Sequence, residues 1–294
     1  MLTAIVPALA LLVSGSPEAD VAAMTPREKA AAVVVAGMPA PVGFGGVLVR
    51  PWNTELPRPP GALVFADQEG GTVKAFPSLA PWRAASQYRS AAEAYASGRQ
   101  TAADLRRAGV DAAFAPVLDL PDGPLGSRQF ARSAYGVAFA RGLGRAACVK
   151  HFPGLGSAAR STDVARVYAV LRSEDLVPFR TAIAAGVPCV MVGHAIYPRL
   201  GPRRASLEPR TNQLLRRLGF RGVAITDSLG VLGSPYAPYW ARLALRAGAD
   251  LVLTTSARDA TRIVAALVPL AQAGELDAKL VRVLRYRRSL ARAR

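Results

Sequence analysis

The stretch Val149-Lys150-His151-Phe152-Pro153-Gly154 is the part of the sequence that most strongly indicates the fold. It continues the apolar run Ala146-Ala147-Cys148, which has the pattern of a buried strand. Because proline and glycine stop a strand, the cationic and imidazole side chains lie where strand becomes loop. In a barrel of parallel strands, this edge is where ligands bind. We therefore expect Lys150 and His151 to hold a substrate.

The composition indicates a folded body with a strong positive charge. The 294 residues suit one large domain or two small ones, and 51% of them are hydrophobic. The net charge of +17 comes almost entirely from arginine and is distributed along the chain. Without a basic stripe interleaved with aromatic residues, nucleic-acid binding is disfavoured. The densest basic segment, 282–288, fits the solvated face of a last helix, and a polyanionic surface such as a cell envelope is a compatible neighbour.

Apolar strand-like runs alternate with helical stretches along most of the chain. The expected strands span 32–37, 46–49, 63–66, 112–117, 147–151, 189–193, 223–226 and 251–254. The expected helices span 91–108, 133–143, 173–185, 212–218, 239–247, 257–273 and 277–293. Eight strands alternating with helices predict an α/β fold, a single-domain (β/α)8 TIM barrel, with a doubly wound open sheet as the alternative. No Gly-x-Gly-x-x-Gly turn follows an early strand, so no nucleotide cofactor is expected.

The N-terminus and the two cysteines leave alternatives open. Residues 2–13 are an apolar run followed by small residues, so 1–23 are expected to be a signal peptide or a disordered N-terminus, and 24–294 the barrel. The protein is accordingly either exported to the cell envelope or cytoplasmic. No transmembrane segment is expected after the N-terminus. Cys148 and Cys189 lie in apolar runs, where two buried thiols are the simpler interpretation and a disulfide between adjacent strands the alternative.

Polar residues recur at the ends of the expected strands. They are Asp67, Asp119 with Arg128 in the loop beyond it, Lys150 with His151, His194, and Asp227. Each has a structural explanation when taken alone, such as a turn cap or a hydrogen-bonded core histidine. A barrel, however, brings equivalent strand ends together at one pocket. Their repetition therefore predicts a ligand site.

Four segments carry a resemblance to a known family. They are Asp67-Gln68-Glu69-Gly70-Gly71, Pro116-Val117-Leu118-Asp119-Leu120, Lys150-His151-Phe152-Pro153-Gly154 and Gly222-Val223-Ala224-Ile225-Thr226-Asp227-Ser228-Leu229. In order and spacing they resemble glycoside hydrolase family 3, and within it the single-domain β-N-acetylhexosaminidases that act on cell-wall sugars. The similarity runs from about residue 24 to 288.

The resemblance implies a retaining hydrolase of β-linked N-acetylhexosamine that acts on a carbohydrate, in keeping with peptidoglycan turnover. Asp227 matches the family's catalytic nucleophile, which forms a glycosyl-enzyme intermediate. Asp67, Arg128, Lys150 and His151 match residues that bind sugar hydroxyls, a task for which charge-assisted hydrogen bonds are suited. We expect His194 to bind the substrate as well. No metal is expected, since no His/Cys cluster has ligand spacing.

The loop after the Lys150 segment departs from the family pattern. The family commonly has His-Gly and then Asp-Ser-His, whose Asp–His pair is the general acid/base. Here Leu155 stands at the first position, and Ser161-Thr162-Asp163 stands where Asp-Ser-His is expected. Thr72 also replaces a common arginine after Gly70-Gly71.

Three interpretations of the missing imidazole remain open. Asp163 could protonate the leaving oxygen directly, as a carboxylic acid can. Glu69 could serve instead, although the resemblance gives it no such role. The third is a catalytically impaired, glycan-binding protein of the same fold. We favour an active or weakly active enzyme, because loss of a general acid slows a reaction by about two to four orders of magnitude without abolishing it.

Overall fold

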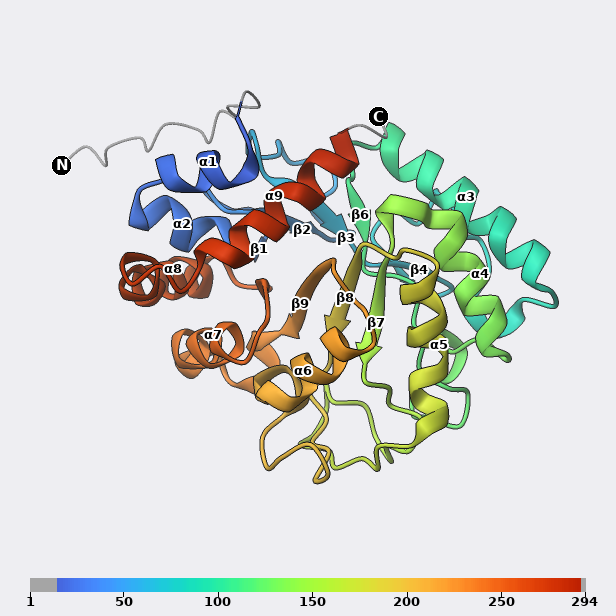
Figure 1. Ribbon diagram of the computed structural model, residues 1–294. Coiled ribbons are helices and arrows are strands. Elements are labelled where there is room, and N and C mark those ends of the chain that lie inside the picture. Colours follow the sequence, from blue (N-terminus) through green and yellow to red (C-terminus); the bar gives the residue numbers. More distant parts are fainter. Residues whose placement is uncertain (1–14, 292–294) are drawn as a thin grey trace.

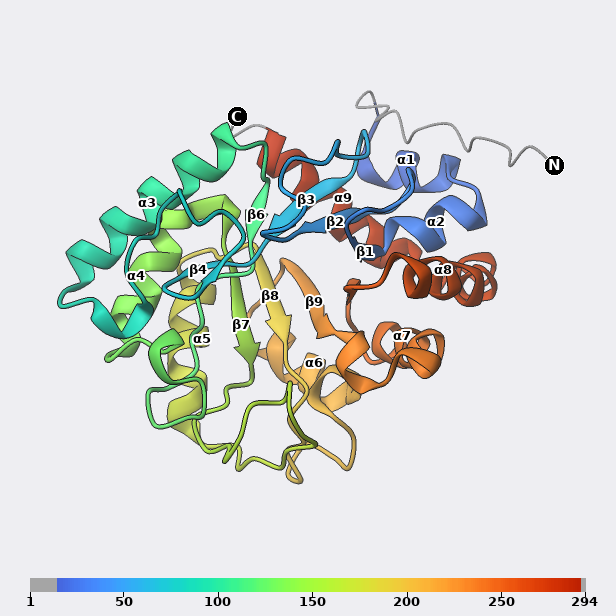
Figure 2. The ribbon, with the colours of Figure 1, turned by 180° about the vertical axis from the view of Figure 1, so that it is seen from behind.

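The computed structural model describes residues 15–291, and in them eight parallel strands form one sheet in the order β6-β3-β2-β1-β10-β9-β8-β7. Parallel bridges from Ala113 to Ala147 and from Val117 to Lys150 join β6 to β7 and close the barrel. The strands are β1 (Val34–Gly37), β2 (Gly46–Val49), β3 (Leu63–Ala66), β6 (Ala112–Ala113), β7 (Cys148–Phe152), β8 (Cys189–Val192), β9 (Val223–Ser228) and β10 (Leu251–Thr254). The predicted (β/α)8 barrel is confirmed, and the open sheet is excluded (Figures 1 and 2).

Helices surround the barrel (Figures 1 and 2). They are α1 (Pro17–Ala23), α2 (Pro26–Ala32), α3 (Ala91–Arg107), α4 (Ser133–Leu143), α5 (Ser173–Ala184), α6 (Pro209–Arg217), α7 (Ala237–Arg246), α8 (Ala257–Gln272) and α9 (Asp277–Ala291). Short 3-10 turns are η1 (Ala85–Gln87), η2 (Gly126–Arg128), η3 (Gly144–Ala146), η4 (Ala205–Leu207), η5 (Leu229–Leu232) and η6 (Ser234–Tyr236). Within residues 15–291, no helix is both long enough and apolar enough to cross a bilayer. The seven expected helices are present, whereas α1, α2 and the hairpin β4 (Gln68–Gly70)–β5 (Val73–Lys74) were not expected.

Alternate strand residues point into the barrel and fill it. This interior cluster contains Phe65 and Phe114, whose rings stack at 4.8 Å, together with Leu48, Met191 and Leu253. Helix α9 adds Val283, Tyr286 and Leu290 to the same cluster. Figure 1 shows α9 lying across the barrel. The last helix therefore closes the N-terminal end of the barrel, and the opposite end is left for a site.

Helix α1 lies within the segment 1–23 that was expected to be a signal peptide or disordered. Residues 1–14 lie outside the described residues, but Pro17–Ala23 form helix α1, which packs along α9. Ser16 caps α1 through its side chain, and Glu18 and Asp20 form ion pairs with Arg285 and Arg288. Cap chemistry and these ion pairs order the segment, so the folded body begins earlier than residue 24.

The basic segment 282–288 forms the predicted solvated face only in part: the side chain of Arg285 is 62% exposed, whereas Arg287 is buried. Besides the pairs of Arg285 and Arg288, Arg282 is bound to Asp250. Arg287 is buried and donates to the carbonyl oxygens of Gly61 and Gly45, which lie just before β3 and β2. Burial lowers the pKa of Arg287 to about 10, so its guanidinium remains charged at neutral pH. These arginines join the last helix to the rest of the barrel.

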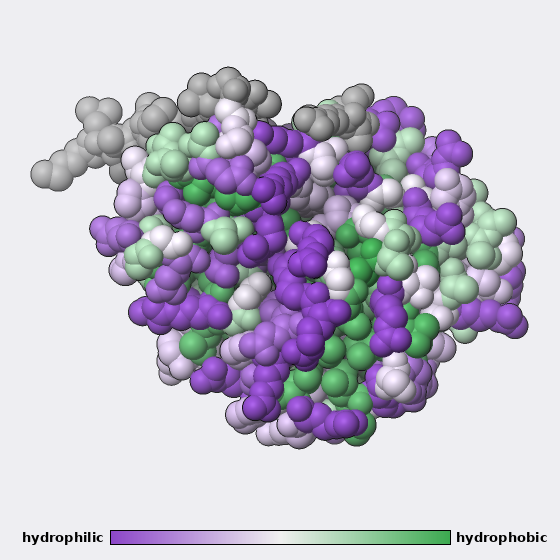
Figure 3. All heavy atoms as spheres, in the orientation of Figure 1, coloured by the Kyte–Doolittle hydropathy of each residue, from purple (hydrophilic) through white to green (hydrophobic). Residues whose placement is uncertain are grey.

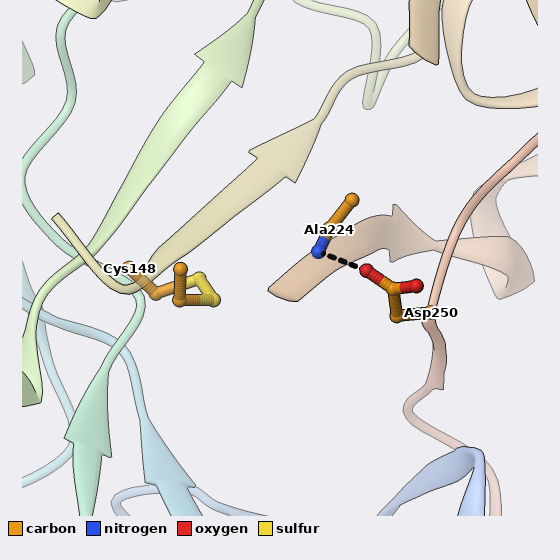
Figure 4. Close-up of a disulfide and its surroundings, with 4 residues drawn as sticks. Cys148, Ala224 and Asp250 are labelled. Atoms are coloured by element: carbon orange, nitrogen blue, oxygen red, sulfur yellow. Dashed lines mark hydrogen bonds between the residues drawn. A yellow bond between two sulfur atoms is a disulfide. The ribbon is translucent and has the colours of Figure 1, made fainter. Parts of the chain in front are cut away.

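Cys148 and Cys189 form a disulfide, so the simpler interpretation of two buried thiols is wrong. They are the first residues of β7 and β8 and lie directly opposite each other in the parallel register (Figure 4). Both side chains belong to the barrel interior. Closing a loop between residues 41 positions apart stabilises the fold chiefly by restricting the unfolded chain. The register that faces the two sulfurs toward each other is a tertiary feature with no local sequence signal.

Asp250 also links separate elements at the same end of the barrel as the disulfide. Its carboxylate is fully buried and accepts hydrogen bonds from the backbone N–H of Ala224 at 2.9 Å, shown in Figure 4, and from Arg216 at 2.7 Å. Its other oxygen accepts from Arg282 at 2.7–2.8 Å. One carboxylate thus joins β9, β10, α6 and α9.

Replacing Asp250 should destabilise the protein strongly. In Asp250→Ala, two guanidinium groups and a buried backbone N–H lose their acceptor, a change that costs about 3–5 kcal/mol. Urea unfolding of the variant measures this loss. The matched control is Asp277→Ala, which removes an ion pair to Lys29 at 2.8 Å whose carboxylate is 43% exposed. The control should lose less than about 1 kcal/mol, and equal losses in the two variants would contradict the role given to Asp250.

Candidate active site

A pocket of about 530 Å³ opens at the C-terminal ends of the strands. Its apolar lining comes from interior residues of the barrel, Leu48, Phe114, Met191 and Leu253. Its polar lining consists of Arg50, Asp67, Glu69, Arg128, Lys150, His151, Asp163, Asp227, Ser228 and Thr255. Six of the seven predicted site residues are therefore brought together here, and His194 is the exception.

A buried ion cluster forms one wall of the pocket. The ammonium group of Lys150 donates to Asp67 Oδ1 at 2.8 Å and lies 2.6 Å from Glu69 Oε1. Arg128 donates to both oxygens of Glu69, at 2.8 Å each, in a bidentate pair. Burial lowers the pKa of Lys150, but Asp67 and Glu69 raise it by more, so the lysine stays charged. The cluster presents fixed charges to a ligand.

Glu69 is paired with two cations. Burial raises its pKa, but Lys150 and Arg128 together lower it to about 2. The carboxyl group is therefore ionised in the neutral range, and both of its oxygens are bonded to the two cations. These contacts argue against Glu69 as the general acid, one of the three interpretations of the missing imidazole. Glu69 instead holds Lys150 and Arg128 in place.

Asp119 fixes the orientation of His151. Its side chain is buried and lies 2.7 Å from His151 Nδ1, which donates to it when protonated at that nitrogen. It also accepts from the backbone N–H of Leu155 at 2.8 Å and, at 3.3–3.4 Å, from that of His151. With Nδ1 occupied by Asp119, Nε2 is the ring nitrogen of His151 that remains for a ligand. The sequence placed Asp119 among the strand-end residues that predict the ligand site, but it did not predict the contact with His151.

Asp227 is the carboxylate at the end of β9. Its Oδ1 accepts from the backbone N–H of Ser228 at 2.7 Å. Burial raises its pKa, yet His151, His194, Lys150 and this N–H outweigh burial, so the pKa falls below its usual value. At neutral pH Asp227 is an ionised carboxylate inside the pocket.

His194 is not among the residues that line the pocket, and its binding of substrate stays a prediction. The side chain is fully buried and both ring nitrogens are used, Nδ1 with Ser206 Oγ at 2.7 Å and Nε2 with the carbonyl oxygen of Ser228 at 3.0 Å. A carbonyl accepts only, so Nε2 carries a proton and Nδ1 accepts from the hydroxyl. Burial lowers the pKa of His194, which keeps it neutral. It supports the backbone next to Asp227.

Asp163 lies at the exposed edge of the pocket, in the long loop between β7 and α5. Its Oδ2 accepts from the hydroxyl of Ser161 at 3.2 Å, and no cation is bonded to it among the described residues. It is close enough to Arg128 and His194 to affect both electrostatically. Asp67 and Glu69, in contrast, are both paired with Lys150.

The sequence analysis missed two features of the pocket. Arg50 follows β2 and lines the pocket, with its guanidinium 5.3 Å from the ring of Trp52. The sequence pattern that indicates Arg50 is the one that indicates the other pocket residues at strand ends, a charged residue directly after an apolar run. The hairpin β4–β5 is fixed by Gln68, whose side chain accepts from the N–H of Phe76 and donates to the carbonyl of Ala80. The hairpin carries Glu69 into the wall of the pocket.

Comparisons with known proteins agree with this arrangement. The sequence model described as "Glycosyl hydrolase family 3 N terminal domain" matches residues 53–286. A curated β-hexosaminidase of Stenotrophomonas maltophilia is 38% identical over 67% of each chain. A solved glycosyl hydrolase of the GH3 family from Mycobacterium smegmatis superposes with a TM-score of 0.79 at 29% identity, covering 90% of this chain and 98% of that one. A β-N-acetylhexosaminidase from Beutenbergia cavernae gives 0.76 at 26% identity, covering 89% and 98%.

The ion cluster predicts a specific pH dependence of stability. The pKa of Glu69 is lower in the folded protein, about 2, than its usual value of 4.5. Its contribution is therefore complete above about pH 4.5 and is lost as the pH falls toward 2. Wild-type protein should lose about 3 kcal/mol more over this range than Glu69→Gln, measured by urea unfolding at a series of pH values. Glu55→Gln, a change at an exposed glutamate, should follow the wild type. Parallel curves for wild type and Glu69→Gln would rule the cluster out as the cause.

Proposed function

Because this chain belongs to glycosyl hydrolase family 3, we propose that it is a retaining β-N-acetylhexosaminidase with Asp227 as its nucleophile. One observation supports the proposal most directly. An ionised carboxylate, Asp227, lies in the same pocket of the barrel as a preorganised cluster of charged hydrogen-bonding groups. The curated and solved relatives named above as hexosaminidases support the choice of sugar.

In the proposed first step, a carboxylate oxygen of Asp227 attacks the anomeric carbon while the bond to the leaving oxygen breaks. The lowered pKa of Asp227 supports this role, because a nucleophile must be deprotonated. Its second oxygen, Oδ1, is held by the N–H of Ser228, which limits rotation of the group. Water then attacks the glycosyl-enzyme ester, and the sugar leaves with its original anomeric configuration.

The ion cluster and His151 are proposed to hold the sugar. Asp67 is 37% exposed and uses Oδ1 for Lys150, so Oδ2 is available to accept from a hydroxyl. Lys150 and Arg128 donate, and His151 offers Nε2. Charged donors and acceptors in fixed positions select hydroxyl-rich ligands, since a misplaced hydroxyl leaves a buried charge unsatisfied. These contacts fix the sugar ring relative to Asp227.

Asp163 is proposed as the general acid/base. Its protonated carboxyl gives a proton to the leaving oxygen, and the resulting carboxylate takes a proton from the water that attacks the intermediate. Two observations support it: the residue lines the same pocket as Asp227, and it is not tied to a cation as Asp67 and Glu69 are. The comparisons give no support to the alternative of a catalytically impaired glycan-binding protein.

The proposed substrate is a glycan that contains N-acetylglucosamine, such as the peptidoglycan of a cell wall. The disulfide between Cys148 and Cys189 supports work in an oxidising compartment, since structural disulfides persist there and are rare in the cytosol. An exported enzyme would meet the cell-wall polymer directly.

The nucleophile is tested by Asp227→Asn. The variant should hydrolyse an aryl β-N-acetylglucosaminide on the order of 10⁴-fold more slowly than wild type, because an amide does not form the ester intermediate. Thermal unfolding should change little. Asp277→Asn, a surface carboxylate change, is the matched control and should keep full activity. An aryl β-glucoside tested in parallel shows the choice of sugar. Full activity in Asp227→Asn would refute the assignment, and no hydrolysis by wild type would favour the glycan-binding alternative.

The acid is tested by Asp163→Ala with a series of leaving groups. Poor leaving groups need protonation, so their hydrolysis should slow by about 10²–10⁴-fold, whereas activated aryl leaving groups should be affected far less. Azide should restore turnover of the activated substrates by replacing the base-assisted water. Ser161→Ala is the matched control, because it removes the hydroxyl bonded to Asp163 and keeps the carboxyl group. An equal loss for all leaving groups would assign Asp163 a structural role instead.

A further inference from the structure

The end of the barrel opposite the sugar pocket carries three adjoining hollows of about 330, 380 and 480 Å³, and all three are lined by Arg145. Arg99 and Arg106 of α3 line the first, Arg221 lines the second and Arg141 of α4 lines the third. All five side chains are exposed. We call this set, Arg99, Arg106, Arg141, Arg145 and Arg221, the basal arginine face.

The basal arginine face has almost no internal charge compensation. Within residues 15–291, none of its five guanidinium groups forms an ion pair or a hydrogen bond with a protein group. Arg282 and Arg285 also line the second hollow, but they are paired with Asp250 and Glu18. The one acidic residue among the described lining residues is Asp111, which accepts from the N–H of Val64. A surface of this kind attracts an external polyanion.

The basal arginine face lies at the opposite end of the barrel from the sugar pocket. Arg145 and Arg221 lie just before β7 and β9, at the N-terminal ends of strands whose C-terminal ends form the sugar pocket. Figure 3 shows hydrophilic residues gathered in a band down the middle of the molecule, in the view in which α9 crosses the barrel. A partner bound at this end leaves the pocket open at the other.

We propose that the basal arginine face docks onto an anionic phospholipid bilayer. Guanidinium groups match phosphate oxygens in bidentate geometry, and cationic side chains are attracted to the surface of anionic lipids. The inference goes beyond the proposed hydrolase function and does not require it. A membrane-bound molecule in this orientation would present its sugar pocket away from the lipid.

Two observations favour a bilayer over a nucleic acid. The five arginines belong to separate segments, α3, α4, η3 and the turn before β9, and not to one helix or strand pair that would fit a groove. In addition, the chain reaches α1 from the apolar sequence run 2–13, and α1 packs on α9 at the same end of the barrel (Figure 1). Stable attachment of a protein to a membrane commonly combines an apolar signal with a basic one.

The test is cosedimentation of the full chain with vesicles at near-physiological salt. Vesicles of phosphatidylcholine with one third phosphatidylglycerol should bind the protein, and added salt should release it. The triple variant Arg141→Gln, Arg145→Gln, Arg221→Gln should partition on the order of a hundredfold more weakly. The matched control triple, Arg203→Gln, Arg242→Gln, Arg258→Gln, removes the same charge at exposed positions outside the three hollows and should change partition only a few-fold.

Each variant is also assayed on the soluble aryl glycoside and by thermal unfolding, so that misfolding is recognised. Should the triple variant not fold, Arg145→Gln alone should weaken partition about fivefold. The proposal would be overturned if the wild type bound pure phosphatidylcholine vesicles as well as the anionic vesicles. It would also be overturned if the two triple variants lost vesicle binding to the same extent. Tighter, arginine-dependent binding of duplex DNA at the same salt would overturn it in favour of a nucleic acid. Vesicle binding is read without hydrolysis, so its outcome is separate from that of the proposed function.

Discussion

The ammonium group of Lys150 is almost completely buried, and a buried charge needs carboxylates around it. This requirement constrains the whole pocket. Glu69 and Asp67 satisfy it, and Glu69 in turn binds Arg128, so two separate segments of the chain, 67–69 and the turn that contains Arg128, are fixed relative to β7. The hairpin β4–β5 places Glu69 next to Lys150 and Arg128. Asp119 does the same for the neighbouring His151. The sugar-holding groups are therefore rigid before any ligand arrives, which is what preorganised recognition requires.

The acid proposed for the reaction is held quite differently from the nucleophile. Asp227 sits on a strand, bonded to Ser228, with His194 supporting the backbone beside it. Asp163 sits on a loop, and within residues 15–291 its carboxylate accepts only from the hydroxyl of Ser161. In the proposed mechanism, binding and nucleophilic attack belong to a fixed strand edge, and proton transfer belongs to a less constrained loop. The departure that removes the expected imidazole falls in the less constrained loop, whereas the second one, Thr72, falls in the hairpin β4–β5.

The strands and most helices could be predicted from sequence because their signals are local. Fully buried strands are continuous apolar runs ended by glycine, proline or charge, and the strands follow that rule except β10, which ends at threonine and serine. Four of the predicted site residues, Asp67, Lys150, His151 and Asp227, could be placed in the pocket for the same reason, since a barrel gathers equivalent strand ends. Arg128 and Asp163 lie on loops, and their place in the site was an expectation from the family resemblance. Features that depend on distant partners could not be predicted. Cys148 lies opposite Cys189 only because of the register of β7 and β8. Arginines of the segment 282–288 form ion pairs with acidic residues that are far away in sequence. His194 forms a hydrogen bond with Ser206 that the sequence does not indicate.

The position of α9 has a consequence for the order of events during synthesis. Its apolar side chains close the base of the barrel, its Arg287 binds the carbonyls that precede β2 and β3, and its Arg282 shares Asp250 with β9. These partners are made long before α9 leaves the ribosome, and proteins otherwise tend to fold from the N-terminus as they emerge. The nascent barrel therefore stays open at one end, and lacks these bonds, until α9 has been translated and has left the ribosome. Completion of the barrel depends on this helix, however early the strands are made.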